Sequence, residues 1–297
     1  MSKQTVFTGA GVALVTPMRP DGVPDLERYR ELVEWQIRNG TDAIITCGTT
    51  GESSTLDYEE HTAVIKAAVE QTAGRVPVIA GTGSNDTAFG VQLSLDAKAL
   101  GADALLLVTP YYNKASQKGL VIHFNAIANA AKIPVILYNV PSRTGVNIKP
   151  DTVAELYKNP YIVAIKEASG NLSEAAQVAA LCDIDIYSGN DDQTVPLLSL
   201  GAKGVISVLS NILPQETHDM VARWMQGDVA GSREIQLKYL KLANALFCDV
   251  NPIPVKYAMN RMGMSVGPCR LPLCEPEDKA AAYIDAVLQE YGLLKGE

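Results

Sequence analysis

Cysteine and histidine are scarce in this chain of 297 residues. The five cysteines are odd in number and form no C-x-x-C pair, and the three histidines show no metal-ligand spacing. These absences argue against a disulfide-rich secreted scaffold and against a zinc module. Scattered single cysteines are typical of reduced thiols, so the composition favours a cytoplasmic protein without a metal site.

Long hydrophobic runs and excess positive charge are also missing. No apolar stretch approaches the roughly 18 residues that cross a bilayer, and the first residues lack the apolar core of a secretory signal. The formal net charge is −8 and the pI is about 5.0. An acidic surface argues against binding to a phosphate backbone, so we predict neither a membrane nor a nucleic-acid partner.

What the chain does contain is a regular series of short apolar runs. Each has four to six residues rich in Val, Ile, Leu and Ala, and a segment with helical periodicity separates most of them. Parallel strands need such crossover helices and read as continuous apolar runs. Eight units predict a closed (β/α)₈ TIM barrel. The runs lie in segments 11–17, 42–52, 76–85, 103–113, 133–141, 161–170, 183–192 and 203–211.

The last quarter of the sequence reads as helical. We therefore predict a catalytic barrel over residues 1–225 and a helical C-terminal extension over 226–297. An open doubly wound sheet is the structural alternative, but no G-x-G-x-x-G follows the first strand to indicate a dinucleotide site.

Polar residues follow the predicted strands, and Lys166 is the most informative of them. It ends the apolar run "YIVAIK" and, counting back by two, should share one face with Ala164 and Ile162. If that face is the barrel interior, burial disfavours the charged ammonium, and a neutral amine is what Schiff-base chemistry with a carbonyl substrate requires. The alternative is a lysine whose ammonium reaches solvent at a strand end.

Other candidates lie at the same ends of neighbouring strands. Tyr138 and Arg143, in "LYNVPSRTG", offer a phenol for proton transfer and a guanidinium for a carboxylate, although a rim aromatic and a surface ion pair are the alternatives. Thr49 and Thr50, in "GTTGESS", offer hydroxyls and backbone N–H groups at the entry of a helix predicted around 58–72. Such an entry can hold a carboxylate or merely be an N-cap cluster.

The loops after the last predicted strands limit the kinds of ligand that we expect. Asn190, Asp191 and Asp192 carry oxygen ligands but lack further clustered carboxylates, so we predict no metal. The loops after the seventh and eighth strands lack the Gly-rich signature of the barrel phosphate site, which favours unphosphorylated substrates.

Nine short motifs along the chain, taken together and in their order, are specific for one protein family. The chain resembles the dihydrodipicolinate synthase / N-acetylneuraminate lyase family of pyruvate-dependent class I aldolases. The resemblance rests on "GVALVTP", "GTTGESSTL", "VIAGTGSN", "VTPYYN", "ILYNVPSRTG", "IKEASGN", "SGNDD", "GVISV" and "NPIPVK".

The resemblance implies roles for individual residues. Lys166 would form a Schiff base with pyruvate, and no cofactor would be needed. Arg143 would hold the carboxylate of L-aspartate 4-semialdehyde, and Tyr112 would reach the neighbouring subunit's site in a homotetramer built as a dimer of dimers. The remaining roles are a proton relay of Tyr138, Thr49 and Tyr112, a pyruvate carboxylate site at Thr50, and pocket walls at Gly189 and Ile206.

Thr49 beside Thr50, together with Arg143, favours the synthase branch, because the lyase and sugar-acid aldolase branches typically have one threonine and lack the arginine. A pyruvate-dependent sugar-acid aldolase or lyase is the alternative enzyme, and a non-catalytic keto-acid-binding barrel is the alternative of another class.

Many synthases of this family are inhibited by L-lysine at a dimer interface. The matching residues here fit in part, but Tyr58 stands where a histidine is common, and Phe89 stands where a glutamate would pair with the effector ammonium. We therefore predict weak or absent inhibition by lysine. The matching set is Ser53, Tyr58, His61, Asn85, Phe89 and Tyr111.

Overall fold

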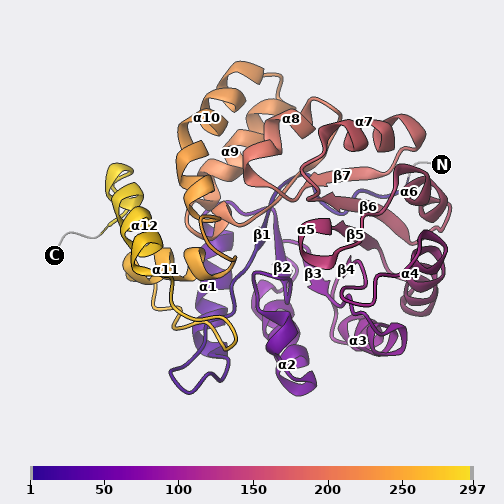
Figure 1. The fold of residues 1–297 in the computed structure, drawn as a ribbon, viewed down its shortest axis with the longest axis horizontal. Coiled ribbons are helices and arrows are strands. Elements are labelled where there is room, and N and C mark those ends of the chain that lie inside the picture. Colours follow the sequence, from indigo (N-terminus) through magenta and orange to yellow (C-terminus); the bar gives the residue numbers. More distant parts are fainter. Residues whose placement is uncertain (1–2, 295–297) are drawn as a thin grey trace.

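The computed structural model describes residues 3–294 and shows a closed barrel of eight parallel strands (Figure 1). Each strand pairs with the next along the chain, and β8 closes the ring on β1. The predicted TIM barrel is therefore confirmed. The strands are β1 Gly9–Ala13, β2 Ala43–Thr46, β3 Val78–Gly81, β4 Ala104–Val108, β5 Val135–Asn139, β6 Ile162–Glu167, β7 Asp185–Ser188 and β8 Gly204–Ser207.

Helices connect the strands and cover the outside of the barrel (Figure 1). The helix predicted around residues 58–72 begins at Tyr58 because Asp57 and Glu60 form a reciprocal capping box. The connecting helices are α1 Leu26–Arg38, α2 Tyr58–Thr72, α3 Thr87–Ala99, α4 Gln117–Ala131, α5 Pro141–Thr144, α6 Pro150–Tyr157, α7 Leu172–Leu181 and α8 Thr194–Leu198, and α9 Pro214–Met225 follows β8. Short 3-10 turns stand at Ser53–Thr55, Asp191–Gln193 and Leu209–Asn211.

Strand side chains alternate between two apolar layers. One layer fills the barrel interior and includes Ile45, Leu106 and Ala164, while the other packs between the sheet and the helices and includes Ile44 and Leu105. The alternation has period two, as in any β-strand. It places every second strand residue inside the barrel.

The strand β6 departs from this alternation at its start. The pairing of β6 with β5 shifts by one residue, because Val135 pairs with Ile162 whereas Ile136 pairs with Ala164. Val163 and Ala164 therefore both belong to the interior layer, and Ile162 belongs to the outer one. The prediction that Ile162 shares a face with Lys166 was wrong, because an irregularity breaks the two-residue count.

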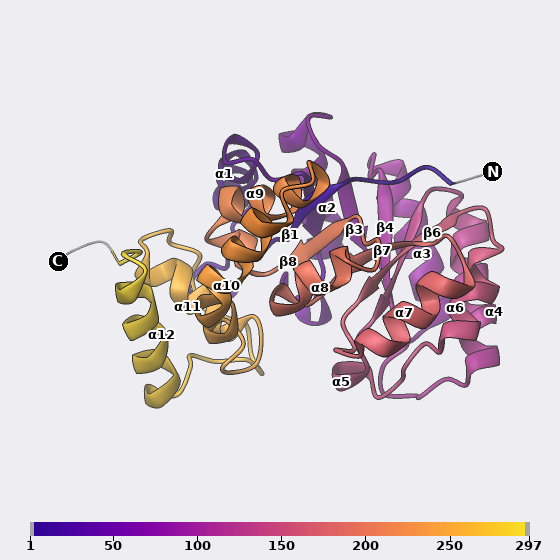
Figure 2. The same ribbon diagram turned by 90° about the horizontal axis from the view of Figure 1, so that it is seen from above.

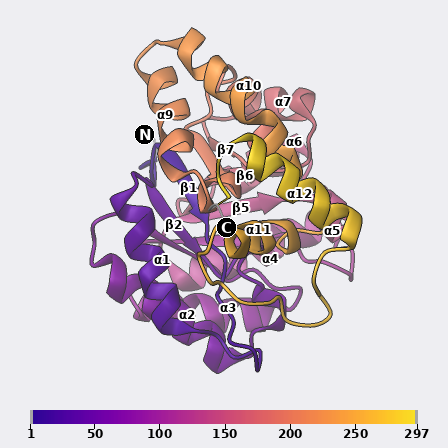
Figure 3. The same ribbon diagram turned by 90° about the vertical axis from the view of Figure 1, so that its left-hand side faces the viewer.

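Beyond the barrel the chain continues as α10 Val229–Ala245, α11 Ile253–Arg261 and α12 Asp278–Glu290. The helix α10 packs on α8 and α9, and α12 packs on α10 and α11. Figure 2 shows α11 and α12 at the side of the barrel farthest from α4 and α6, and Figure 3 shows them in front of the strands. The predicted boundary at residue 225 falls at the end of α9, and the division into two units stays a prediction.

Among residues 3–294, no helix is both long enough and apolar enough to span a membrane.

Candidate active site

Lys166 lies on β6 directly opposite Tyr138 on β5, with Tyr187 of β7 on its other side. Its side chain is only 6% exposed, and the Nζ atom lies 4.3 Å from the centre of the Tyr138 ring. A protonated amine is attracted to the face of an aromatic ring. The structure thus places the amine and the phenol ring together inside the barrel, as the sequence predicted for these two residues.

Gly189 lies against the lysine side chain. Its N–H donates to the Glu167 carbonyl oxygen (2.7 Å), and a Cβ at this position would stand 3.1 Å from Lys166 Cε and 2.6 Å from Ala168 Cβ. Only glycine leaves this space open. Ile206, on β8, is fully buried in the interior layer. Of the two predicted wall residues, Ile206 therefore lies inside the barrel, and Gly189 lies directly after the end of β7.

The loop that carries Thr49 and Thr50 follows β2 through a tight left-handed turn. Cys47 has φ of 52°, and the end of β3 approaches so closely that a Cβ on Gly81 would stand 2.1 Å from the Cys47 carbonyl oxygen. Because glycine at position 81 has no Cβ, the backbone segments around Gly81 and Cys47 can lie this close together. The turn directs the loop over the carboxyl ends of the strands, where Thr49 is half-buried and Thr50 is buried.

Thr50 and Arg143 come from different strand ends and are joined by one residue of the C-terminal extension. The Asn251 side-chain amide donates to Thr50 Oγ1 (3.0 Å), and Arg143 Nη2 donates to the Asn251 carbonyl oxygen (3.1 Å). The two predicted carboxylate-binding residues therefore belong to one hydrogen-bonded unit.

Tyr112 is not brought to Lys166 within this chain. It lies after β4 with φ of 72°, and its side chain is 91% exposed. Tyr111 beside it is 37% exposed, and its carbonyl oxygen accepts a hydrogen bond from the Asn85 amide (3.3 Å). The predicted role of Tyr112 in a partner's site stays a prediction.

Of the six residues predicted to form a lysine site, three lie on α2 or α3, and the other three lie in a 3-10 turn or in loops. The Tyr58 hydroxyl donates to an Asp96 carboxylate oxygen (2.7 Å), and Phe89 is 43% exposed. His61 is buried with Nε2 at 2.8 Å from the Gly81 carbonyl oxygen, and this burial lowers its pKa. Ser53 begins the short turn after the threonine loop. Whether these positions respond to lysine stays a prediction.

The thiol of Cys47, next to the threonine loop, is buried. It is buried between the Thr46 hydroxyl (3.6 Å) and the His61 carbonyl oxygen (3.7 Å), and burial raises its pKa to about 12. The thiolate is the reactive form of cysteine.

Asp191, weighed above as an oxygen ligand for a metal, has a different local role. The backbone N–H groups of Val208 and Leu209 both donate to its Oδ2 (3.0 Å each), and Gln236 donates to its carbonyl oxygen (2.8 Å). Burial raises the pKa of this carboxyl. Between residues 3 and 294 no group of three or more His, Cys, Asp or Glu side chains is placed to hold a metal ion.

Asn251, Lys256 and Arg270 are parts of the site region to which sequence reasoning assigned no role. The first two lie in "NPIPVK", a motif used only to establish the resemblance. A lysine inside an otherwise apolar helix start was the available signal, because a buried lysine is rare unless it is paired.

The chain is an α/β barrel with a buried lysine that faces a tyrosine at the carboxyl ends of the strands. This arrangement is suited to imine chemistry. The family model of the dihydrodipicolinate synthetase family matches residues 6–291. The chain belongs to this family.

Individual relatives agree with the family model. The chain is 56% identical to 4-hydroxy-tetrahydrodipicolinate synthase of Lachnoclostridium phytofermentans, over 97% of this chain and 99% of the relative. A dihydrodipicolinate synthase from Acinetobacter baumannii, solved with pyruvate, superposes with a TM-score of 0.95 at 44% identity, over 98% and 100% of the two chains. One from Cyanidioschyzon merolae, solved with lysine bound, gives 0.95 at 41%, with the same coverage.

Proposed function

We propose that this chain condenses pyruvate with L-aspartate 4-semialdehyde to form 4-hydroxy-tetrahydrodipicolinate, a step of lysine and diaminopimelate biosynthesis. The observation that carries the proposal is the buried Lys166 amine, 4.3 Å from the Tyr138 ring centre at the carboxyl ends of the barrel. The high identity to a relative with this activity in its name supports the same reaction.

In the proposed reaction Lys166 is the nucleophile. Its neutral Nζ adds to the keto carbon of pyruvate, and loss of water gives a Schiff base. Removal of a methyl proton yields an enamine, whose carbon then attacks the aldehyde of the second substrate. The amine of the second substrate finally adds to the imine carbon, which closes the ring and releases Lys166.

Each of these steps moves a proton, and we assign this proton transfer to Tyr138. Its ring lies beside the amine that gains and loses protons, and we assign Thr49 and the Tyr112 of a partner subunit to the same relay. This assignment extends the proposal to a homo-oligomer, a tetramer built as a dimer of dimers. The 91% exposure of the Tyr112 side chain supports it, because a free tyrosine at the rim is available to a partner. We further propose that the enzyme works in the cytoplasm.

The two substrates each carry a carboxylate, and we assign one residue to each. Thr50, with the loop N–H groups, holds the carboxylate of pyruvate, and Arg143 holds that of aspartate semialdehyde by a charge-assisted fork. Asn251 contacts both residues, which supports their action in one site.

Borohydride trapping tests the proposal directly. Reduction in the presence of pyruvate should leave a stable adduct on Lys166 that mass spectrometry of peptides locates. Lys166→Ala should abolish both the adduct and turnover, whereas Lys158→Ala, at an exposed lysine after α6, should change neither. A wild-type enzyme without adduct would instead indicate a keto-acid-binding barrel.

A panel of aldehydes then identifies the second substrate. With pyruvate present, aspartate semialdehyde should be turned over much faster than sugar aldehydes. Faster turnover of the sugar aldehydes would instead favour the sugar-acid aldolase or lyase reading.

A further inference from the structure

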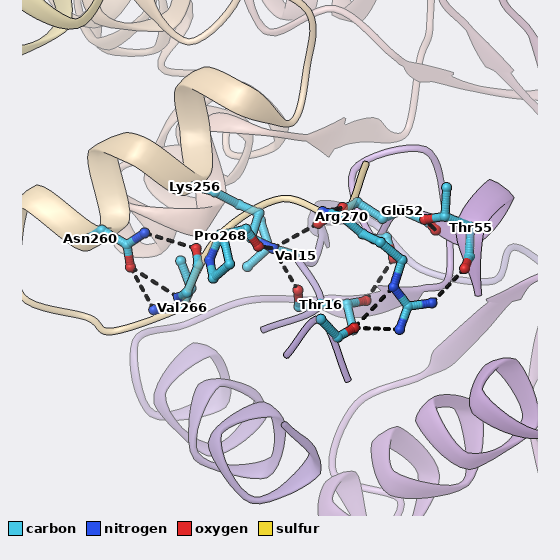
Figure 4. Close-up of polar contacts among 12 residues, drawn as sticks. Val15, Thr16, Glu52, Thr55, Lys256, Asn260, Val266, Pro268 and Arg270 are labelled. Atoms are coloured by element: carbon cyan, nitrogen blue, oxygen red, sulfur yellow. Dashed lines mark hydrogen bonds and ion pairs between the residues drawn. The ribbon is translucent and has the colours of Figure 1, made fainter. Parts of the chain in front are cut away.

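Glu52 and Lys256 form a buried ion pair between the threonine loop and the C-terminal extension (Figure 4). Lys256 Nζ lies 2.7 Å from Glu52 Oε1. The Lys256 side chain is 2% exposed and the Glu52 side chain is 1% exposed. Glu52 ends the loop that begins after β2, and Lys256 lies on α11. The pair therefore joins a barrel loop to a helix outside the barrel.

The pair is hydrogen-bonded on both sides. Lys256 Nζ also donates to the carbonyl oxygens of Thr16 (3.1 Å) and Pro268 (2.5 Å), which uses all three of its N–H donors. The second carboxylate oxygen of Glu52 accepts the backbone N–H of Arg270 (2.8 Å). Desolvating two charges costs as much as their attraction returns, so a buried pair adds little net stability over apolar residues. We therefore consider the geometry that the ion pair fixes, not its contribution to stability.

That geometry is the path of the threonine loop. Glu52 has φ of 56°, and its N–H donates to the Thr49 carbonyl oxygen (3.1 Å). The neighbouring Gly51 carbonyl oxygen accepts a hydrogen bond from Thr16 Oγ1 (2.7 Å). Fixing the Glu52 carboxylate therefore fixes the backbone turn that carries both threonines.

The same short segment of the extension holds the loop at a second point. Asn251, five residues before Lys256, donates to Thr50 Oγ1 (3.0 Å). Around the pair, the Arg270 guanidinium binds both carboxylate oxygens of Glu60 (2.6 and 2.7 Å), which ties the chain after α11 to α2 (Figure 4 shows Arg270).

We propose that the Lys256–Glu52 ion pair positions Thr49 and Thr50 for pyruvate, and that both of its members are positioning residues for the reaction. Neither side chain is assigned a contact with substrate, and both act through the loop. The inference rests on the proposed function, in which these threonines serve pyruvate.

Two variants separate positioning from simple stabilisation. Lys256→Met leaves a buried carboxylate without its cation, so it should lower the melting temperature. The double variant Lys256→Met with Glu52→Gln removes the unpaired charge, and the Gln amide can still accept from the Arg270 N–H. Its melting temperature should return toward that of the wild type.

The deciding measurement is the pyruvate concentration that half-saturates borohydride trapping. We expect it to rise about tenfold or more in both variants and kcat to fall, because small misplacements of binding groups cost large factors in rate. The KM for aspartate semialdehyde should stay within about twofold, because Arg143 donates to the Asn251 backbone carbonyl oxygen and bonds to neither member of the ion pair.

Asn260→Ala is the matched control. Asn260 lies on α11 and binds the backbone of Val266 and Gly267, but its side chain makes these bonds away from the loop. This variant should lower the melting temperature and leave the half-saturating pyruvate concentration unchanged.

Two results would overturn the inference. One is a double variant whose pyruvate saturation recovers together with its stability, and the other is an Asn260→Ala variant that weakens pyruvate saturation equally. An error in the proposed function is recognised separately, because the wild-type enzyme would then form no adduct at Lys166.

Discussion

Tyr138 and Lys166 face each other across neighbouring strands, with the amine nitrogen 4.3 Å from the centre of the tyrosine ring. Direct register between β5 and β6 produces this approach, so no loop needs to move to bring the two groups together. The ring lies against the amine, and the hydroxyl is the group to which we assign proton transfer. The two contributions can be separated by mutation.

Tyr138→Phe keeps the ring and removes the hydroxyl. We expect kcat to fall by about 10²- to 10⁴-fold, the range for loss of a general acid–base group, with little change in melting temperature. Steady-state kinetics and a thermal melt measure both quantities. Tyr161→Phe, just before β6, should leave kcat unchanged, and an unimpaired Tyr138→Phe enzyme would remove Tyr138 from the relay.

Gly189→Ala places a methyl group against the Lys166 side chain. The new Cβ would stand 2.6 Å from Ala168 Cβ and 3.1 Å from Lys166 Cε, so either the loop or the lysine must shift. We expect a loss of about 1–3 kcal/mol in unfolding free energy and slower trapping of the pyruvate adduct. Gly119→Ala, on the exposed start of α4 with ordinary contacts, serves as the control and should slow nothing.

Lysine inhibition should be weak or absent, because Phe89 offers no carboxylate to an effector ammonium. A charge-assisted hydrogen bond of this kind contributes about 1.5–3 kcal/mol. In an activity titration we expect no inhibition by L-lysine below about 1 mM, and Phe89→Glu should strengthen inhibition by roughly 10- to 150-fold. Sub-millimolar inhibition of the wild-type enzyme would contradict the prediction.

The Glu60–Arg270 ion pair predicts a loss of stability in acid. Hydrogen bonding to Arg270 holds the pKa of Glu60 below its ordinary value of 4.5. Because the folded-state pKa is the lower one, the pair stabilises the protein above about pH 4.5, and this stabilisation disappears as the pH falls through the folded-state value. It is worth about 1 kcal/mol or less for a partly exposed pair.

Thermal melts of the wild type and Glu60→Gln test this sign. The variant should be less stable near neutral pH, and the difference should shrink as the pH falls from about 6 to about 3. Glu59→Gln, at an exposed neighbour, should show no such convergence. A difference that grows in acid would show that the assumed direction is wrong.

The barrel and the central residues of the candidate site followed from the sequence because they depend on local patterns. Apolar runs with intervening helices define the strands, and strand ends define where Lys166 and Tyr138 meet. Ile162 was misplaced because a register irregularity leaves no mark in a run that is apolar on both faces. Asn251 and Lys256 received no role because their partners lie some two hundred residues earlier, which no local pattern encodes.

That separation has a consequence for how the protein is made. Glu52 leaves the ribosome 204 residues before the lysine that neutralises it. At about 5–20 residues per second, the interval is roughly 10 to 40 seconds. During this time the Glu52 carboxylate, which is buried in the folded protein, has no Lys256 ammonium to pair with. The last barrel strand ends at Ser207, so all eight strands are synthesised before Lys256, and the Glu52–Lys256 contact that fixes the threonine loop can form only after that lysine has been made.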